Sequence, residues 1–145
     1  MGKDDSLERF LTAQQQCYQI ALEEIKTGKK KSHWMWFIFP QIAGLGHSST
    51  ARYYGIKDMS EAKAYIENAV LGRNLIEISG ELLRLDSNDP EAVMGYPDNL
   101  KLKSSMTLFA LAKPDCEVFQ KVLDKYFQGE KDKKTMEILG ETGPA

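Results

Sequence analysis

The spacing of apolar residues predicts helices along almost the whole chain. From Leu7 to Ile25, apolar residues recur at steps of three and four, which is typical of an amphipathic helix. Asp5 or Ser6 can cap this helix and Gly28 can close it. The same spacing, with further caps and glycine stops, predicts helices at residues 50–56, 60–69, 71–85, 90–95, 98–110, 114–127 and 132–139.

One apolar run has no clear period. Six large apolar residues follow one another from Trp34 to Phe39, and Pro40 stops the run because it cannot continue a helix or a central strand. The period alone allows a buried strand or a short buried helix, but Ser32 as a cap and the helical neighbours favour a helix. We therefore expect an all-α protein, a single irregular multihelical bundle of about seven or eight helices.

Composition narrows the class of protein. The 145 residues are 42% hydrophobic and 28% charged, which fits one globular domain over residues 1–145 with frayed ends at 1–4 and 141–145. A net charge of −2 makes nucleic acid an improbable partner. The chain lacks a signal-like apolar segment and any apolar window of transmembrane length, so we expect a cytoplasmic protein without membrane contact.

The polar residue types also limit the chemistry. Two cysteines fall on apolar helix faces, where free buried thiols are usual, and two histidines lie fourteen positions apart without a third ligand at metal spacing. We therefore expect neither a metal site nor a cofactor. The triplet at residues 29–31 follows a predicted helix end, where lysines complement the helix dipole in solvent.

A glycine loop follows the apolar run and predicts an anion site. Gly44 and Gly46 permit a close approach of the backbone, and Ser48 can cap a short helix that carries Arg52. Backbone N–H groups at a helix start, with a guanidinium, favour a phosphate or carboxylate. In the alternative interpretation, the glycines only turn the chain and Arg52 pairs with a surface carboxylate.

The two tryptophans are candidates for ligand stacking. In a helix, residues two positions apart point about 200° from each other, so one of the Trp34 and Trp36 rings can join the core while the other lines a pocket. One ring is then expected in the core and the other in a pocket, although aromatic runs are most often core throughout.

Four stretches are similar to a known family. The segments RFLTAQ, SHWMWFIFPQIAGLGHS, DNLKLKSSMTLF and FQKVLDKYFQGEKDKKTMEIL resemble small, mainly bacterial proteins grouped as domain of unknown function 1810, and the resemblance covers essentially the whole chain. It implies a multihelical fold and no established activity. Some relatives carry a calpastatin label, but that inhibitor is disordered whereas this composition is globular.

Two shorter stretches are similar to the YbiA-like or NADAR superfamily. Glu8 followed by Thr12-Ala13-Gln14 resembles its glutamate helix, and Lys101 with Met106 resembles its lysine and methionine helix. The chain lacks that superfamily's leading aromatic and proline segment and its tryptophan-glycine ending. The resemblance implies a YbiA-like fold and hydrolysis of a glycosidic bond in an ADP-ribose-like or phosphoribosyl compound.

Such a reaction needs a carboxylate near the anomeric carbon, donors for phosphate and a surface for the base. Glu8 or Asp98 is the candidate catalytic carboxylate, and Lys101 and Arg52 are the candidate cations. Each carboxylate also has a structural alternative, because Glu8 can complement a helix dipole and Asp98 can cap a helix.

Three functions of different classes remain open. Convergence of Glu8, Arg52 and Lys101 on one cleft would favour an enzyme. An aromatic and glycine pocket without a poised carboxylate would favour a non-catalytic module for a small anionic, nucleotide-like ligand. An exposed aromatic patch at residues 34–39 would favour a protein-interaction module.

Overall fold

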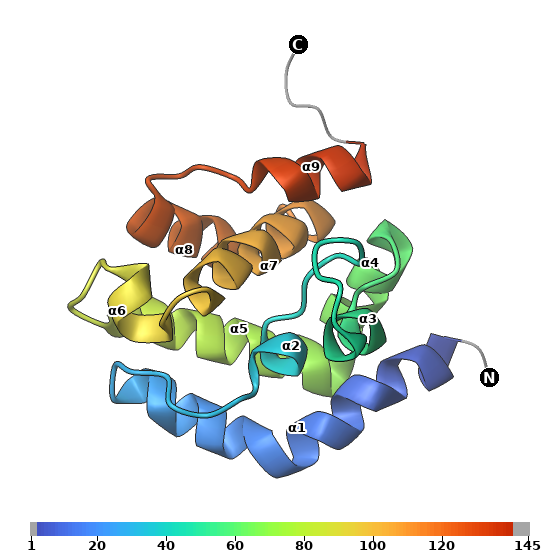
Figure 1. Ribbon diagram of the computed structural model, residues 1–145, viewed down its shortest axis with the longest axis horizontal. Coiled ribbons are helices and arrows are strands. Elements are labelled where there is room, and N and C mark those ends of the chain that lie inside the picture. Colours follow the sequence, from blue (N-terminus) through green and yellow to red (C-terminus); the bar gives the residue numbers. More distant parts are fainter. Residues whose placement is uncertain (1–2, 141–145) are drawn as a thin grey trace.

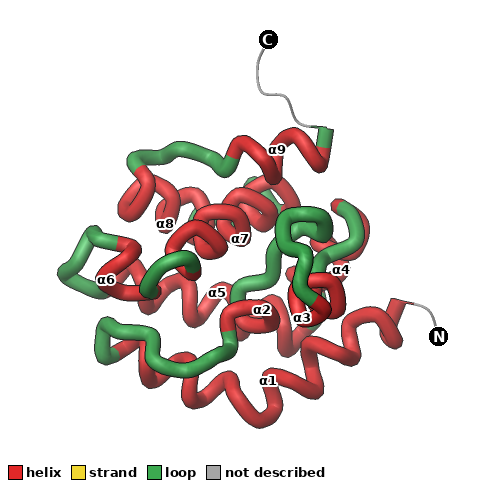
Figure 2. The backbone as a smooth tube through the Cα atoms, in the orientation of Figure 1, coloured by secondary structure: helices red, strands yellow, loops and turns green. Residues whose placement is uncertain are grey.

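The chain folds entirely into helices and connecting loops. The computed structural model describes residues 3–140. In this range it contains nine α-helices and no β-strand, apart from one isolated β-bridge between Ile42 and Ile56 (Figure 2). The all-α expectation is confirmed, but the expected seven or eight helices are too few. In chain order the helices are α1 (Lys3–Lys26), α2 (Met35–Ile38), α3 (Ser49–Tyr54), α4 (Met59–Glu67), α5 (Ala69–Arg84), α6 (Pro90–Met94), α7 (Asp98–Ala112), α8 (Val118–Phe127) and α9 (Lys133–Leu139).

The helices are arranged around α5 and α7. Figure 1 shows α1 along one side of the molecule and α8 and α9 on the other, with α5 and α7 between them. Accordingly, α5 packs against α1, α4 and α8, whereas α7 packs against α4, α6, α8 and α9. Within residues 3–140, none of the helices combines the length and the apolar character needed to cross a bilayer.

Helix α7 is buried nearly all round. The apolar residues Leu102, Met106 and Phe109 are fully buried, and so are the polar residues Ser105 and Thr107. Two hydroxyls bond backbone carbonyls of the preceding turn: Ser104 Oγ donates to the Leu100 carbonyl at 3.2 Å and Thr107 Oγ1 to the Lys103 carbonyl at 2.8 Å. The Ser105 hydroxyl is buried without a hydrogen-bond partner among the described residues. A helix enclosed on all sides loses the amphipathic period.

Side-chain caps set three of the helix starts that the sequence predicted, those of α3, α6 and α9. Asp89 Oδ1 accepts from the N–H groups of Glu91 and Ala92 ahead of Pro90, and Asp132 Oδ2 accepts from Thr135 N at 2.9 Å. Such caps satisfy N–H groups that have no partner within the helix.

Five predicted starts were wrong. Helix α1 begins at Lys3 and not after Asp5 or Ser6. Ser60 does not open α4, because Asp58 accepts from Glu61 N and starts the helix earlier. Helix α8 starts at Val118 and not at the Pro114 turn, and Pro97 rather than Asp98 holds the N-cap of α7. Ser32 does not cap α2, because its side chain bonds elsewhere.

The close packing of α4 and α5 requires Gly72. A glycine inside a helix usually weakens it. Here, however, a Cβ built on Gly72 would lie 2.0 Å from the Ile66 carbonyl oxygen. No side chain fits at that distance. The absence of a side chain therefore permits the two helices to approach each other.

The Glu24 carboxylate organises the loop between α1 and α2. Its oxygens accept from Lys31 N (2.7 Å), Ser32 N (2.9 Å), Ser32 Oγ (2.5 Å) and Trp34 Nε1 (2.9 Å). Burial alone would raise the pKa of Glu24, but the donated hydrogen bonds outweigh it and lower the pKa to about 2. The ionised side chain therefore stabilises this loop.

We expect Glu24→Gln to lower the free energy of unfolding at pH 7 by about 2 kcal/mol, because bonds to a charged acceptor are lost. The pKa of Glu24 is depressed in the folded protein, so its contribution is complete above about pH 4.5 and disappears as the pH falls toward about 2. Urea unfolding of both proteins between pH 7 and pH 2 should show the difference shrinking in that window. Glu23→Gln, at an exposed neighbour, is the control; a difference that does not depend on pH would contradict the assignment.

Candidate functional site

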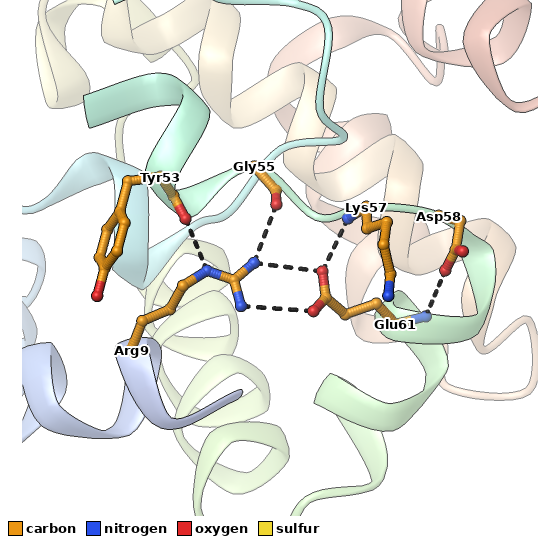
Figure 3. A network of polar contacts seen from close by, with 6 residues as sticks. All are labelled: Arg9, Tyr53, Gly55, Lys57, Asp58 and Glu61. Atoms are coloured by element: carbon orange, nitrogen blue, oxygen red, sulfur yellow. Dashed lines mark hydrogen bonds and ion pairs between the residues drawn. The ribbon is translucent and has the colours of Figure 1, made fainter. Parts of the chain in front are cut away.

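A polar cluster fixes α1 to the segment between α3 and α4 (Figure 3). The Arg9 guanidinium donates from Nε to the Tyr53 carbonyl at 2.7 Å and from Nη2 to the Gly55 carbonyl at 3.0 Å. It also pairs with both Glu61 oxygens, at 3.2 and 3.4 Å. This geometry uses most of the donors of the guanidinium fork.

Glu61 is the buried member of this cluster. Its side chain is 5% exposed, and Oε1 also accepts from Lys57 N at 2.8 Å. A buried carboxylate is tolerated only when it is paired and hydrogen-bonded. Arg9 is therefore needed to hold the backbone after α3 in place, and with it Tyr53 and Tyr54.

A pocket of about 530 Å³ lies beside this cluster, between α1 and α3. Within the described residues, it is lined by the following side chains: Glu8, Arg9, Thr12, Ala13, Gln16, Tyr53 and Tyr54. We call it the Glu8 pocket. The spacing of Glu8, Thr12 and Gln16 places them on one stripe of α1, and the pocket volume is in the range of small-molecule sites.

The walls of the Glu8 pocket combine a carboxylate with aromatic rings. Glu8 is exposed, and Thr12 Oγ1 lies 3.5 Å from Glu8 Oε2 as a donor. The rings of Tyr53 and Tyr54 meet edge to face with centroids 4.8 Å apart, and Tyr53 is 60% exposed. Arg9 is already paired, so the pocket suits a ligand with a planar ring and hydroxyl or amino donors better than one that needs Arg9 as a free cation.

Four other predicted residues meet at a second place, beside the start of α7. Asp98 Oδ2 pairs with Lys30 Nζ at 2.8 Å, and Asp98 Oδ1 lies 3.5 Å from Lys101 Nζ. The two ammonium groups lie over indole rings, Lys30 at 4.9 Å from the Trp34 centroid and Lys101 at 4.7 Å from that of Trp36. Cation–π contact and ion pairing thus join Trp34, Trp36, Asp98 and Lys101.

This arrangement corrects two expectations. Asp98 does not cap α7 through its side chain but lies in the first turn as an ion-pair partner. Lys30 is not a solvated member of a lysine triplet, since its side chain is only 7% exposed and also donates to the Ser32 carbonyl at 2.5 Å. Both charges are therefore used in holding the loop before α2 against α7.

The two tryptophans differ in burial. Trp34 is 1% exposed and precedes α2, whereas Trp36 lies within α2 and is partly exposed. Trp36 and Gly46 border a cavity of only about 10 Å³, about the size that holds one water molecule. Ligand stacking on Trp36 stays a prediction.

The glycine loop is tightly packed. Gly44 has a φ of +105°, which favours glycine, and a Cβ on Gly46 would lie 2.7 Å from Ala51 Cβ. Ser48 Oγ accepts from Ala51 N at 3.1 Å, as its predicted capping role requires. Arg52 is exposed on α3. The glycines thus have a packing role whether or not the loop binds an anion.

The predicted residues do not converge on a single cleft. Among the described residues, the side chains around the Glu8 pocket include neither Arg52 nor Lys101. No group of three or more histidine, cysteine, aspartate or glutamate side chains within residues 3–140 is arranged to hold a metal ion. The contribution of Arg9, Tyr53 and Tyr54 was missed, although two adjacent tyrosines in the short helix predicted at residues 50–56 were a local signal. Only the structure shows that α3 has no buried side chain.

Comparison with known proteins agrees with the all-α fold. The model of the family described as "Protein of unknown function (DUF1810)" matches residues 4–139, so the chain belongs to this family. A solved structure, that of the conserved hypothetical protein Rv1873 from Mycobacterium tuberculosis, is 43% identical in sequence. It superposes with a TM-score of 0.91, and the match covers 92% of this chain and 96% of that chain. None of the curated proteins matches.

We expect Trp34→Ala to cost about 3 to 5 kcal/mol of unfolding free energy, because it empties a core site and removes a donor to Glu24. Trp36→Ala, at a partly exposed position, should cost about 1 to 2 kcal/mol. Chemical denaturation followed by circular dichroism measures both. Equal losses, with ligand binding intact in both variants, would show that the two rings are simply core.

Arg9→Ala should lower the unfolding free energy by about 3 kcal/mol, because it removes the cation that faces the buried Glu61 carboxylate. Arg52→Ala is the matched control at an exposed arginine, with an expected change within about 0.5 kcal/mol. Urea midpoints of the two variants test this. If the urea midpoint of Arg9→Ala equals those of Arg52→Ala and the wild type, the Arg9 cluster does not stabilise the fold.

Proposed function

We propose that the protein binds a small molecule containing a ribosyl ring in the Glu8 pocket and hydrolyses its glycosidic bond. The observation that supports this most is that an exposed carboxylate, Glu8, and two tyrosines line the same pocket of about 530 Å³. An ADP-ribose-like or phosphoribosyl compound has the matching groups, namely a planar base and sugar hydroxyls. The similarity of the Glu8 helix to the NADAR pattern points to the same substrate class.

In this proposal Glu8 is the general base. Its carboxylate takes a proton from a water molecule while the water oxygen forms a bond to the anomeric carbon. The bond from that carbon to the base nitrogen breaks, its electron pair leaves with the nitrogen, and solvent protonates the leaving group. Tyr53, which is 60% exposed, would stack against the base with the Tyr54 ring nearly perpendicular to it, and Thr12 would orient the carboxylate.

The assignment favours Glu8 over Asp98. Asp98 is already paired with two lysines, whereas no ion pair involves Glu8 among the described residues. Arg52 is exposed on the same helix as Tyr53 and Tyr54, which supports it as the cation for a phosphate group. Lys101 lies over Trp36, so in this proposal it holds Asp98 rather than the substrate.

A non-catalytic binding module is the second candidate. Such a module would use the same pocket. The glycine loop is tightly packed and Arg9 is already paired with Glu61, so neither supplies a group that would activate a leaving group. A protein-interaction module through residues 34–39 has less support, because most of this run is buried and leaves no aromatic patch for a partner.

The decisive experiment uses Glu8→Gln, which keeps the shape of the side chain and removes its charge. Wild type and variant are incubated with ADP-ribosyl and phosphoribosyl compounds, and release of the base is followed by chromatography. We expect turnover to fall about 100-fold or more in the variant, with Glu23→Gln on the same helix unchanged. Undiminished turnover would remove Glu8 from the mechanism. Ligand-induced stabilisation without turnover would favour the binding module.

A further inference from the structure

A second cavity, of about 640 Å³, lies on the other flank of α1, in the groove between α1 and α5. Its floor is formed by two buried amides, Gln14 (5% exposed) and Asn74 (8% exposed). Gln14 is fully used, because Nε2 donates to the Phe37 carbonyl and to the Tyr65 hydroxyl while Oε1 accepts from Asn74 Nδ2. The floor is therefore rigid and polar.

Two opposite charges line this groove one helical turn apart on α5. Glu77 is held from α1 by Tyr18, whose hydroxyl donates to Glu77 Oε1 at 2.6 Å. Burial, together with the Glu77 carboxylate, raises the pKa of Tyr18, so the hydroxyl stays a donor at neutral pH. Arg73 also lines the groove, and within residues 3–140 no ion pair joins it to Glu77.

The other end of the groove is apolar. Gln14 bonds Asn74 and Tyr18 bonds Glu77, so α1 and α5 run parallel, as Figure 1 shows. Leu11 and Val70 line the end nearest the start of α5, and Val70 is 41% exposed. The groove thus has a carboxylate, a guanidinium and an apolar surface in sequence.

We infer that this groove binds a zwitterionic dipeptide with apolar side chains. Residues four apart on a helix have Cβ atoms about 6 Å apart, and two extended residues span about 7 Å. A free dipeptide therefore places its carboxylate at Arg73 and its ammonium at Glu77, each against the opposite charge. Its apolar side chain lies against Leu11 and Val70, and its peptide group lies above the Asn74 amide.

The test is calorimetric titration of the full chain with leucyl-leucine, its C-terminal amide and its N-acetyl derivative. Wild type should bind the free dipeptide about tenfold more tightly than either derivative. In Arg73→Gln the preference over the amide should disappear, and in Glu77→Gln the preference over the N-acetyl form should disappear. Arg84→Gln, at an exposed arginine of α5 outside the groove, is the control and should keep both preferences.

Three results would overturn the inference. The first is no binding of leucyl-leucine by the wild type at millimolar concentration. The second is equal binding of all three compounds, and the third is survival of the preferences in the groove variants. Glu8→Gln should leave dipeptide binding unchanged, so failure here is distinct from failure of the proposed hydrolysis in the Glu8 pocket.

Discussion

The structure depends most on the buried amide of Gln14. Helix α2 ends at Ile38, so the Phe37 carbonyl is one of the terminal carbonyls without a partner in its own helix. Gln14 Nε2 donates to it at 2.8 Å and to the Tyr65 hydroxyl at 2.9 Å, and Asn74 Nδ2 donates to Gln14 Oε1 at 2.9 Å. Leaving any of these groups unpaired in the interior is costly, so α1, α2, α4 and α5 are held in one arrangement.

That arrangement makes α1 the wall of both cavities. Glu8, Thr12 and Gln16 follow one stripe of the helix and face the Glu8 pocket, whereas Gln14 and Tyr18 face the groove beside α5. Because both stripes belong to one rigid helix, a change in its position would alter both cavities. Gln14 and Asn74 form the floor of the groove, and the hydrogen bond between them also fixes α1 against α5. The same two residues therefore line a cavity and stabilise the fold.

Charges in the interior fix the loops and helix ends. Lys125 Nζ donates to the carbonyls of Leu82, Leu83 and Leu85 and satisfies the end of α5, where carbonyls lack helical partners. Lys30, which is largely buried, forms an ion pair with Asp98. Burying either ammonium group is costly unless a carboxylate or backbone carbonyls lie beside it. Only loop conformations that supply these partners are therefore stable.

The sequence by itself determined the approximate positions of most helices and the burial of most of the aromatic run, because these depend on neighbours within a few residues. Asp89 followed by Pro90 predicted the start of α6, and Asp132 predicted the start of α9. The spacing of apolar residues predicted α5 and most of α8. Only the tertiary structure decided that Asp98 pairs with Lys30 and that Glu8 and Tyr53 line the same pocket. Local periodicity contains no information about which distant side chains meet, since ion pairs and cavities form only when whole helices pack.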